Sequence, residues 1–371
     1  MGAGAGEAVT SRRPRFAAAL PSLAAAFLLS VMANPVAAEP YLAVREGLTC
    51  SGCHVSPTGG GLRNAYGNLY AQQQLPMVAA GGEDLWTGSL LDRFGVGANG
   101  RVSGSYAEQS DVDDNLDFQV DRVTVYGSAA LNDHVLLYVD QQLAPGGSAN
   151  REAWIRLSWN DLYLRAGRFF LPYGWRLEDN GALVRRETGV SMDQGDNGVA
   201  LGWITPRFEA ELAVTNGNGG GSEVDDGKLV TGRFAWLAGP LQLGVSGADN
   251  DTDTVERTMF GVFGGLRTGP LTWLAEYDRI EDSDDLLGDV ESGVGLFEVN
   301  WLIARGNNLK ATVEVQHFED DLDDRFRYSL VYELFPWPFT QVRAGVRVRD
   351  SDDPDPRLNT EEGFVQLHAF F

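Results

Sequence analysis

The sequence is poor in cysteine and histidine, with two Cys and four His among 371 residues. Only Ser51 and Gly52 separate the two cysteines, Cys50 and Cys53, so a function that uses both leaves none for a structural disulfide. A zinc site would need further Cys or His ligands nearby, and none follow His54. A thioredoxin-like dithiol would need a βαβ context, which this sequence lacks. The cysteine pair therefore points to another kind of chemistry.

Positive charge and long apolar runs are also scarce. The formal net charge of −23 argues against nucleic acid as a partner. A group of arginines, an apolar stretch from Phe16 to Val31 and the small residues Val36-Ala37-Ala38 predict a secretory signal peptide over residues 1–38. After it, no run of about 18 apolar residues occurs, so we expect no helical membrane span.

The run Cys50-Ser51-Gly52-Cys53-His54 has the C-x-x-C-H spacing that attaches c-type haem. In such a site the two cysteines form thioethers with the haem vinyl groups, and the histidine binds the iron axially. We therefore predict one haem c, covalently held by Cys50 and Cys53 and axially ligated by His54. A chance C-x-x-C pair, either a redox dithiol or half of a zinc site, is the alternative interpretation.

The segment 39–90 is expected to form a haem-binding unit that precedes the rest of the fold. Within it, apolar and aromatic residues at helical spacing predict a helix over 62–75, whose face covers the haem. The second axial position of the iron is open at this stage. Its candidate ligands are Met77, His368 and His134, besides a solvent molecule.

From about residue 92 the sequence becomes a series of segments in which apolar residues alternate with polar ones, as in β-strands. We expect about sixteen strands, an even number within the range of bacterial outer-membrane barrels. The chain also ends on a strand with a terminal Phe371 and apolar residues at alternate positions. Their expected bounds are 92–107, 115–130, 134–143, 151–159, 162–170, 198–205, 207–215, 228–237, 241–248, 255–267, 271–280, 292–304, 309–318, 326–335, 339–349 and 361–371.

The connections between these segments alternate between tight turns and longer polar loops. Short turns at one rim and long loops at the other are the layout of an outer-membrane barrel, with the long loops outside the cell. A soluble β-sandwich has no reason to alternate so regularly, and no four-strand blade repeat of a propeller is present. The fold class is therefore predicted as all-β, a transmembrane antiparallel β-barrel over 91–371 that follows the short helical segment.

The period-two pattern also predicts which face of each strand meets lipid. On the strand 339–349, valines alternate with arginines, and a charge on the lipid face would cost about 2–4 kcal/mol at the midplane. Two interpretations of the inward arginines stay open: a salt-bridged wall and an anion-selective filter. The residues predicted to line the pore are Arg156, Arg343, Arg347 and Arg349.

The stretch 165–175, which reads R-A-G-R-F-F-L-P-Y-G-W, resembles a motif of the phosphate-selective O/P-type porins. In that family a similar run closes one strand and opens a long loop. The loop that follows here continues to about Asn197 and contains Arg176, Arg185 and Arg186. We expect it to fold inward as a constriction.

A C-x-x-C-H segment followed by a porin-like barrel resembles the fused outer-membrane cytochrome–porins, whose best-known members oxidise extracellular iron. The resemblance implies electron transfer across the bacterial outer membrane, from an extracellular donor such as Fe(II) to a periplasmic carrier, with the haem in the lumen or at its mouth. No hydrolytic or transferase site is evident. Acidic stretches in the outer loops, at 111–114, 282–289, 319–324 and 352–355, would concentrate cations such as Fe(II), but solvation and divalent-bridged contacts with lipopolysaccharide are the preferred explanation of them.

The alternative function is an anion- or phosphate-selective porin in which the haem segment is a plug or a sensor. The state of the lumen discriminates between the two, because a filled lumen conducts little. Whether the barrel works alone or as a homotrimer is left open by the sequence.

Overall fold

The computed structural model describes residues 39–82, 85–109, 115–193, 195–221, 226–252, 255–284, 288–319, 324–351 and 359–371. The predicted signal peptide, residues 1–38, lies outside the described residues. So do the predicted acidic stretches 111–114 and 352–355, and most of 319–324.

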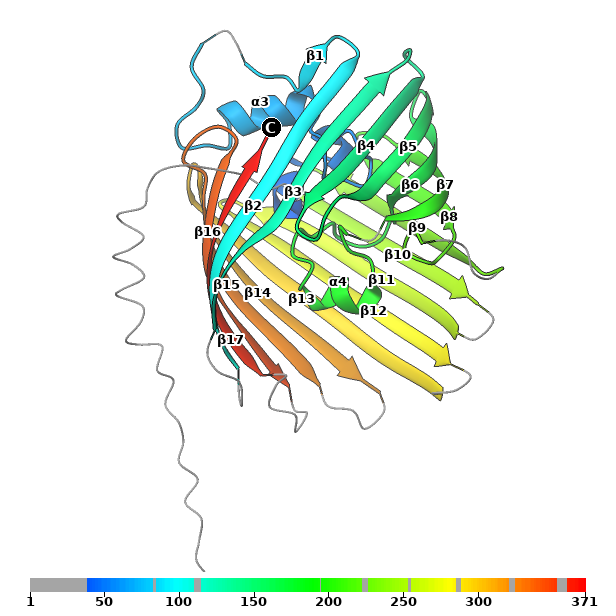
Figure 1. Cartoon of the computed structure of the whole chain (residues 1–371). Helices are drawn as coiled ribbons and strands as arrows, with labels where there is room; N and C mark the ends of the chain where they lie inside the picture. Colours follow the sequence, from blue (N-terminus) through cyan, green and yellow to red (C-terminus); the bar gives the residue numbers. More distant parts are fainter. Residues whose placement is uncertain are drawn as a thin grey trace, which may run out of the picture. The chain divides into compact units, whose positions relative to one another are not determined.

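The strands β2 to β17 form one closed antiparallel barrel of sixteen strands, each paired with its neighbour in sequence (Figure 1). The ring closes where β17 pairs with β2, for example through His368 opposite Arg101. The predicted all-β fold and the strand number are therefore confirmed. The strands are β2 Phe94–Gln109, β3 Asn115–Ala130, β4 Val135–Ala144, β5 Ala149–Trp159, β6 Leu162–Phe170, β7 Gly195–Ile204, β8 Phe208–Thr215, β9 Lys228–Ala238, β10 Leu241–Asp251, β11 Val255–Thr268, β12 Leu271–Asp284, β13 Gly288–Ala304, β14 Asn307–Phe318, β15 Arg325–Leu334, β16 Thr340–Ser351 and β17 Thr360–Phe370.

The strand bounds of β3 and β6 coincide with the predicted ones, and most others differ by one to four residues. The largest extensions are at the hairpin of β12 and β13, where pairing continues to Asp284 opposite Gly288. Polar residues extend these strands beyond the apolar pattern, because the ladder of backbone hydrogen bonds does not depend on side-chain polarity. A short strand that the pattern did not predict, β1 (Ser89–Leu91), pairs with the start of β2.

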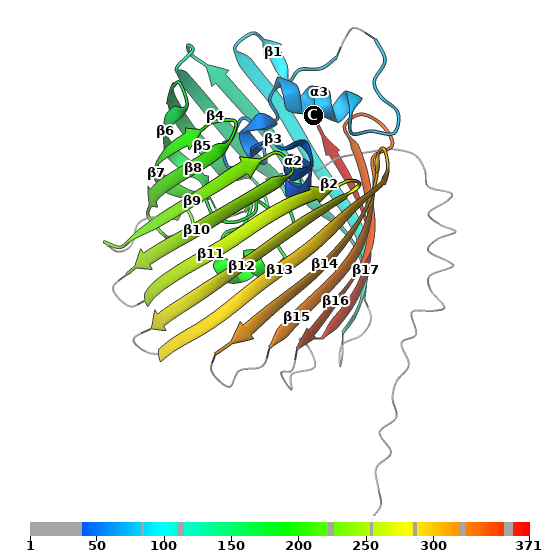
Figure 2. The same cartoon turned by 180° about the vertical axis from the view of Figure 1, so that it is seen from behind.

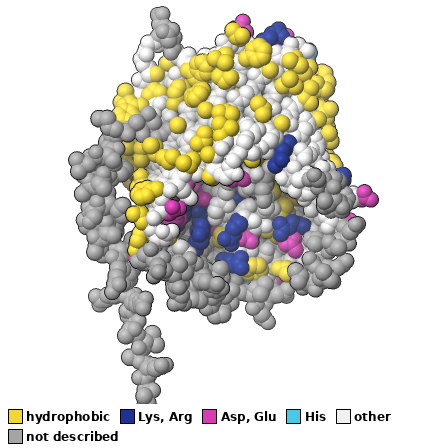
Figure 3. Space-filling model, viewed as in Figure 1, with side chains coloured by type: hydrophobic (Ala, Val, Ile, Leu, Met, Phe, Trp, Pro, Cys, Tyr) yellow, Lys and Arg dark blue, Asp and Glu magenta, His cyan; other side chains and the backbone are white. Residues whose placement is uncertain are grey.

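The outer wall of the barrel is apolar and the inner wall is polar. Leu212 and Leu330 are 55% and 47% exposed, whereas the inward Glu211 and Arg343 are buried. Figure 3 shows hydrophobic side chains spread over the outer wall, and Lys, Arg, Asp and Glu gathered in a hollow at the end of the barrel that carries the long loops. The described residues include no helix that is long and apolar enough to cross a membrane. The alternation nevertheless gives the strands one face suited to lipid.

Two segments occupy the barrel, one of them with its helix α3 at the rim that carries the short turns (Figure 1). The first, residues 39–82, is called the plug here; it contains α2 (Pro40–Glu46), the 3-10 helix η2 (Cys50–Gly52) and α3 (Ala65–Gln73). The second, residues 171–193, is called the inward loop and contains α4 (Leu183–Thr188). Figure 1 shows α4 within the ring of strands, where it contacts β12, β13 and β14, and α2 contacts β11 and β12 (labelled in Figure 2). The inward fold predicted for this loop is therefore confirmed.

The plug enters at the rim that carries the short turns. Arg45 donates to the carbonyl of Pro270 in one such turn, at 3.4 Å. The backbone N–H of Met77 donates to the carbonyl of Phe335 in another, at 2.7 Å. The plug and the inward loop then meet inside the barrel in a shared hydrophobic core, which includes Tyr41 of α2 and Trp175 of the loop. An apolar core of this kind occupies space that an open channel would leave to water.

Candidate functional site

The C-x-x-C-H run forms a tight, hydrogen-bonded turn in the plug. Helix α2 ends at Gly47, which has a left-handed φ of 67°, and η2 begins three residues later. The backbone N–H groups of Cys53 and His54 both donate to the carbonyl of Cys50, at 3.2 and 3.1 Å. His54 also forms an isolated antiparallel bridge with Arg63. The turn thus places both cysteines and the histidine on one compact, ordered piece of backbone.

Three consecutive glycines, Gly59 to Gly61, follow this turn, and all three have positive φ angles of 85°, 73° and 60°. The space around them is closed. A Cβ added to Gly60 would lie 2.2 Å from Cε of Met192 in the inward loop, and one on Gly61 would lie 2.1 Å from the hydroxyl of Tyr138 on β4. Three glycines in a row would on their own favour a flexible break at this point. The structure instead shows a close-packed turn in which a side chain at Gly60 or Gly61 would displace its neighbours.

Helix α3 is fastened to the turn by its N-cap. The side chain of Asn64 accepts from the backbone N–H of Gly67 at 3.0 Å and donates to the carbonyls of Ser51 and Gly52, both at 3.1 Å. A Cβ on Gly67 would lie 2.2 Å from the carbonyl oxygen of Cys53. The small residue therefore lets the helix approach the turn closely.

The face of α3 that the spacing predicted to be covered is only partly so. Tyr66 is 49% exposed, while Ala71 and Asn68 are almost fully buried. Small residues decide which face of α3 is buried. They let the helix backbone approach the turn more closely than a face of tyrosines would. Tyr70 does line the cavity beside Cys53. Its hydroxyl donates to Glu46 of α2 at 3.0 Å.

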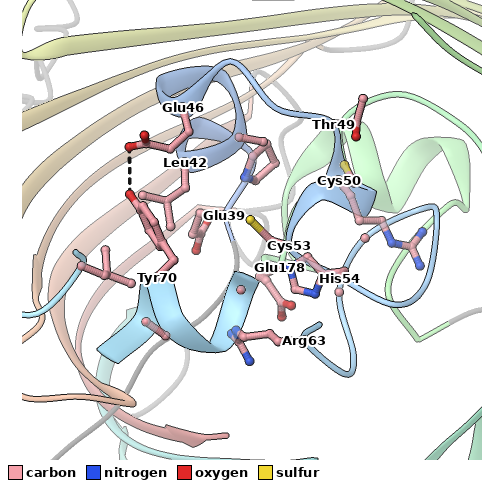
Figure 4. Close-up of a pocket in the computed structure, with 18 of the residues that line it drawn as sticks. Glu39, Leu42, Glu46, Thr49, Cys50, Cys53, His54, Arg63, Tyr70 and Glu178 are labelled. Atoms are coloured by element: carbon pink, nitrogen blue, oxygen red, sulfur yellow. Dashed lines mark hydrogen bonds between the residues drawn. The ribbon is translucent and has the colours of Figure 1, made fainter. Parts of the chain in front are cut away.

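A small cavity of about 70 Å³ lies where the plug and the inward loop meet. In Figure 4, Cys53 and His54 point into the same space as Arg63 of the plug and Glu178 of the inward loop. Its remaining lining residues are Glu39, Pro40, Leu42, Ala43, Glu46, Thr49, Cys50, Gly59, Gly60, Gly67, Tyr70, Ala71, Leu75, Arg176 and Met192.

Burial keeps the chemical groups of the turn neutral. It raises the pKa of the Cys50 thiol to about 12 and that of Cys53 to about 11. It also lowers the pKa of His54 to about 3, with a smaller contribution of the same sign from Arg63. The Nδ1 atom of His54 is buried and has no hydrogen-bond partner. A neutral, incompletely satisfied imidazole is the form that ligates iron.

The charged residues of the cavity come from both segments. Burial would raise the pKa of Glu178, but Arg101, Arg122 and Arg151 outweigh this effect and lower it to about 2. Arg101 of β2 pairs with Glu178 at 2.7 Å. Arg176 stacks on the ring of Phe170 at 4.0 Å, and two of its guanidinium nitrogens are buried without a partner. The site thus combines apolar walls with a cationic group that an anionic part of a ligand can neutralise.

Buried polar contacts hold the plug against the barrel wall. Lys310 of β14 donates to Glu39 at 2.9 Å, and Tyr41 donates to Glu333 of β15 at 2.9 Å. On the opposite wall, the backbone N–H of Leu62 donates to the hydroxyl of Tyr138 at 3.1 Å. The plug is therefore anchored on both sides of the lumen.

The three residues proposed as second axial ligands do not line the cavity of Cys53. Met77 is 48% exposed and lies against Gly306. His134 is exposed at the rim, where its ring contacts the carbonyl of Ser158 at 2.9 Å. His368 is buried, as its inward parity suggests, but it packs beside Phe370.

The four arginines predicted to line the pore lie on strands whose inner face meets the plug and the inward loop. Arg156 donates to the carbonyl of Val55 in the plug at 3.2 Å. Arg343 lies 3.7 Å from Glu39, and Arg347 lies 3.3 Å from Asp179 of the inward loop. Arg349 lies farther along the same strand, near that loop. Of the two interpretations left open, the contacts of these side chains favour the salt-bridged wall.

Several residues of the site were not found from the sequence. Met192, Glu178 and Lys310 carry no local motif, and each reaches the plug from a distant part of the chain. Among the described residues there is no cluster of three or more His, Cys, Asp or Glu side chains that could hold a metal ion by themselves.

No protein-family model and no curated protein sequence matches the chain. Solved structures do match. They include an anion-selective porin from Comamonas acidovorans, with a TM-score of 0.61 and 12% identity, over 75% of this chain and 99% of that one. The trimer form of OmpT from Vibrio cholerae matches with a TM-score of 0.59 and 14% identity, over 76% and 100%. OprB of Pseudomonas putida matches with 0.58 and 10%, over 75% and 94%.

The fold of the chain is thus that of the outer-membrane porins. Each of these porins is covered almost completely, and about a quarter of this chain lies outside the match. At such low identity the similarity concerns the fold.

Proposed function

We propose that this chain is an outer-membrane barrel, closed by its own plug, that carries one haem c for electron transfer across the membrane. The observation that carries the proposal is the shared cavity of Cys50, Cys53 and His54, which lies inside the barrel between the plug and the inward loop. A haem placed there would be enclosed by the barrel and would have protein on both sides.

The donor set of the cavity fits a covalently bound haem. Cys50 and Cys53 would hold it through thioethers, and His54 would bind its iron. Leu42, Ala43 and Leu75 supply apolar wall, and Arg176 offers unpartnered guanidinium nitrogens for a propionate. When bound, the haem supplies one-electron chemistry. The chain's own residues position it and limit the access of water.

The orientation of the barrel follows from its two rims. Short turns face the periplasm in outer-membrane barrels, so the plug would enter from the periplasmic side, near a soluble electron carrier. The charged hollow at the other end would face the outside (Figure 3). A donor such as Fe(II) could approach there. Since one neighbour in fold is a trimer form of OmpT, a homotrimer is the assembly that we propose to test first.

Two measurements test this function. Haem staining of the denatured protein should be positive for the full-length chain and lost when Cys50→Ser and Cys53→Ser are combined, because only a thioether survives denaturation. In intact cells, a donor that cannot cross the outer membrane should reduce the haem. Reduction by periplasmic donors alone would overturn the conduit.

The second candidate is an anion-selective porin in which the plug regulates flow. Two observations favour it: the similarity in fold to an anion-selective porin, and the arginines on the inner wall. Many of these arginines pair with carboxylates, as Arg185 does with Glu276 of β12. Planar-bilayer recordings of the full-length chain separate the two functions. Steady anion-selective conductance would support the porin, and silence would support the closed conduit.

A further inference from the structure

We propose that Met192 of the inward loop is the second axial ligand of the iron. This inference rests on the haem site proposed above and names a residue that the sequence did not suggest. It also assigns the inward loop a role: the barrel, and not the plug alone, would complete the coordination of the metal.

Met192 is the methionine that the fold brings to the cavity. Its side chain is 2% exposed and lines the same cavity as Cys53 and His54. It lies directly against the glycine turn, because a Cβ on Gly60 would be 2.2 Å from its Cε and 3.8 Å from its Sδ. The absence of a side chain at Gly60 is what leaves room for the thioether.

The other described methionines do not lie at this site. Met77 is about half exposed at the short-turn rim. Met259 is buried on β11, within the hydrophobic core that the plug and the inward loop share. Neither lines the cavity of the cysteines. Among the described residues, Met192 is therefore the thioether that is best placed for the iron.

The backbone of Met192 is held in place by hydrogen bonds that do not involve its side chain. Its carbonyl accepts from Nε of Arg151 on β5, at 3.2 Å, and its N–H donates to Asn180 at 3.3 Å. Arg151 in turn lies 3.6 Å from Asp140 of β4. The thioether is thus free to bind, while the barrel wall fixes its position.

Ligation by Met192 would have two consequences. A thioether opposite an imidazole raises the reduction potential of a c-type haem relative to two imidazoles. The iron would also join His54 of the plug to the inward loop. Loss of the methionine ligand would therefore change the haem spectrum and loosen the plug, without removing the haem.

The test compares Met192→Ala, Met192→His and the control Met259→Ala in purified full-length protein. Barrel folding is first checked in each variant by its compact migration on unheated gels. Haem staining should remain positive in all of them. Met192→Ala should lose the long-wavelength charge-transfer band of thioether-ligated ferric haem, and its ferrous form should gain binding of carbon monoxide. Met192→His should restore a six-coordinate spectrum with a lower reduction potential, and Met259→Ala should match the unmodified chain.

Two negative outcomes have different meanings. If staining is positive and Met192→Ala leaves the ferric spectrum and the potential unchanged, the assignment of Met192 is wrong and the haem site stands. If the unmodified chain shows no covalent haem, the proposed function fails and the assignment of Met192 fails with it.

Discussion

The ammonium group of Lys310 on β14 donates to the carboxylate of Glu39, 271 positions earlier in the chain, at 2.9 Å. The pair is buried within the barrel, and Lys310 also lies 3.5 Å from Glu333 and 3.9 Å from Glu298. Arg343 lies 3.7 Å from Glu39 and 3.5 Å from Glu333, so two cations offset these carboxylates at the point where the plug begins. In a low-dielectric interior, removing one partner of a buried ion pair is costly, because the other charge stays buried without full compensation.

Replacing Lys310 by Met should therefore destabilise the protein by up to about 3–5 kcal/mol, because the buried carboxylates of Glu39 and Glu333 lose one of these two cations and keep Arg343. The measurement is the Tm of the detergent-solubilised protein by circular dichroism. Lys228→Met, at an exposed position on β9, is the matched control and should change the Tm little. Adding Glu39→Gln to Lys310→Met should recover part of the loss. Equal Tm values for Lys310→Met and the control would contradict this role of the pair.

Acid should weaken the attachment of the inward loop through Glu178. Its pKa in the folded protein is lowered to about 2, so it contributes stability that is fully present above its ordinary value of 4.5 and is lost as the pH falls through about 2. The Tm should drop over this window, and the drop should be smaller in Glu178→Gln. That variant should already have a lower Tm at pH 7, since its amide cannot pair with Arg101 as a carboxylate does. Parallel pH profiles for the two proteins would show that Glu178 is not the responsible group.

The barrel could be predicted because the residues that specify each strand are close together in the sequence. Alternation of residues such as Val346 and Arg347 records which face meets lipid, and turn residues mark the strand ends. The observed exposures follow this parity, with Val346 exposed and Arg343 buried. The C-x-x-C-H turn could also be found from the sequence, because both cysteines and the histidine lie within five consecutive residues.

The interior could not be predicted in the same way. Contacts such as Met192 with Gly60, or Lys310 with Glu39, join residues from separate parts of the chain, and no periodicity records them. Helix α3 shows a second limit. Its spacing favoured a covered aromatic face, but the close approach of Gly67 to Cys53 decided which side is buried.

The outward face of β15 can be tested directly. Leu330 lies near the middle of this strand and is 47% exposed on the outer wall. Leu330→Arg should reduce the free energy of folding into lipid bilayers by about 2–4 kcal/mol if the site is near the midplane. Leu330→Ala should cost less, since it brings no charge into lipid. Denaturant titrations in vesicles give both values, and a tolerated arginine would argue against a membrane-facing surface here.

The glycine turn of the plug allows a test in which backbone strain and crowding are separated. Gly60 and Gly146 have nearly the same φ, 73° and 76°, so an alanine at either position must adopt a left-handed φ, at a cost of about 1–2 kcal/mol. Their surroundings differ, because a Cβ on Gly146 meets nothing within 4 Å, whereas one on Gly60 meets Met192 at 2.2 Å. Gly60→Ala should therefore lose an additional ~1 kcal/mol, at the low end of the cost of overpacking a core, because the atom that must move is the flexible end of the Met192 side chain. It should also make the plug more sensitive to protease than Gly146→Ala does. Equal losses of Tm and equal cleavage in the two variants would mean that the turn and the inward loop are not in the contact described.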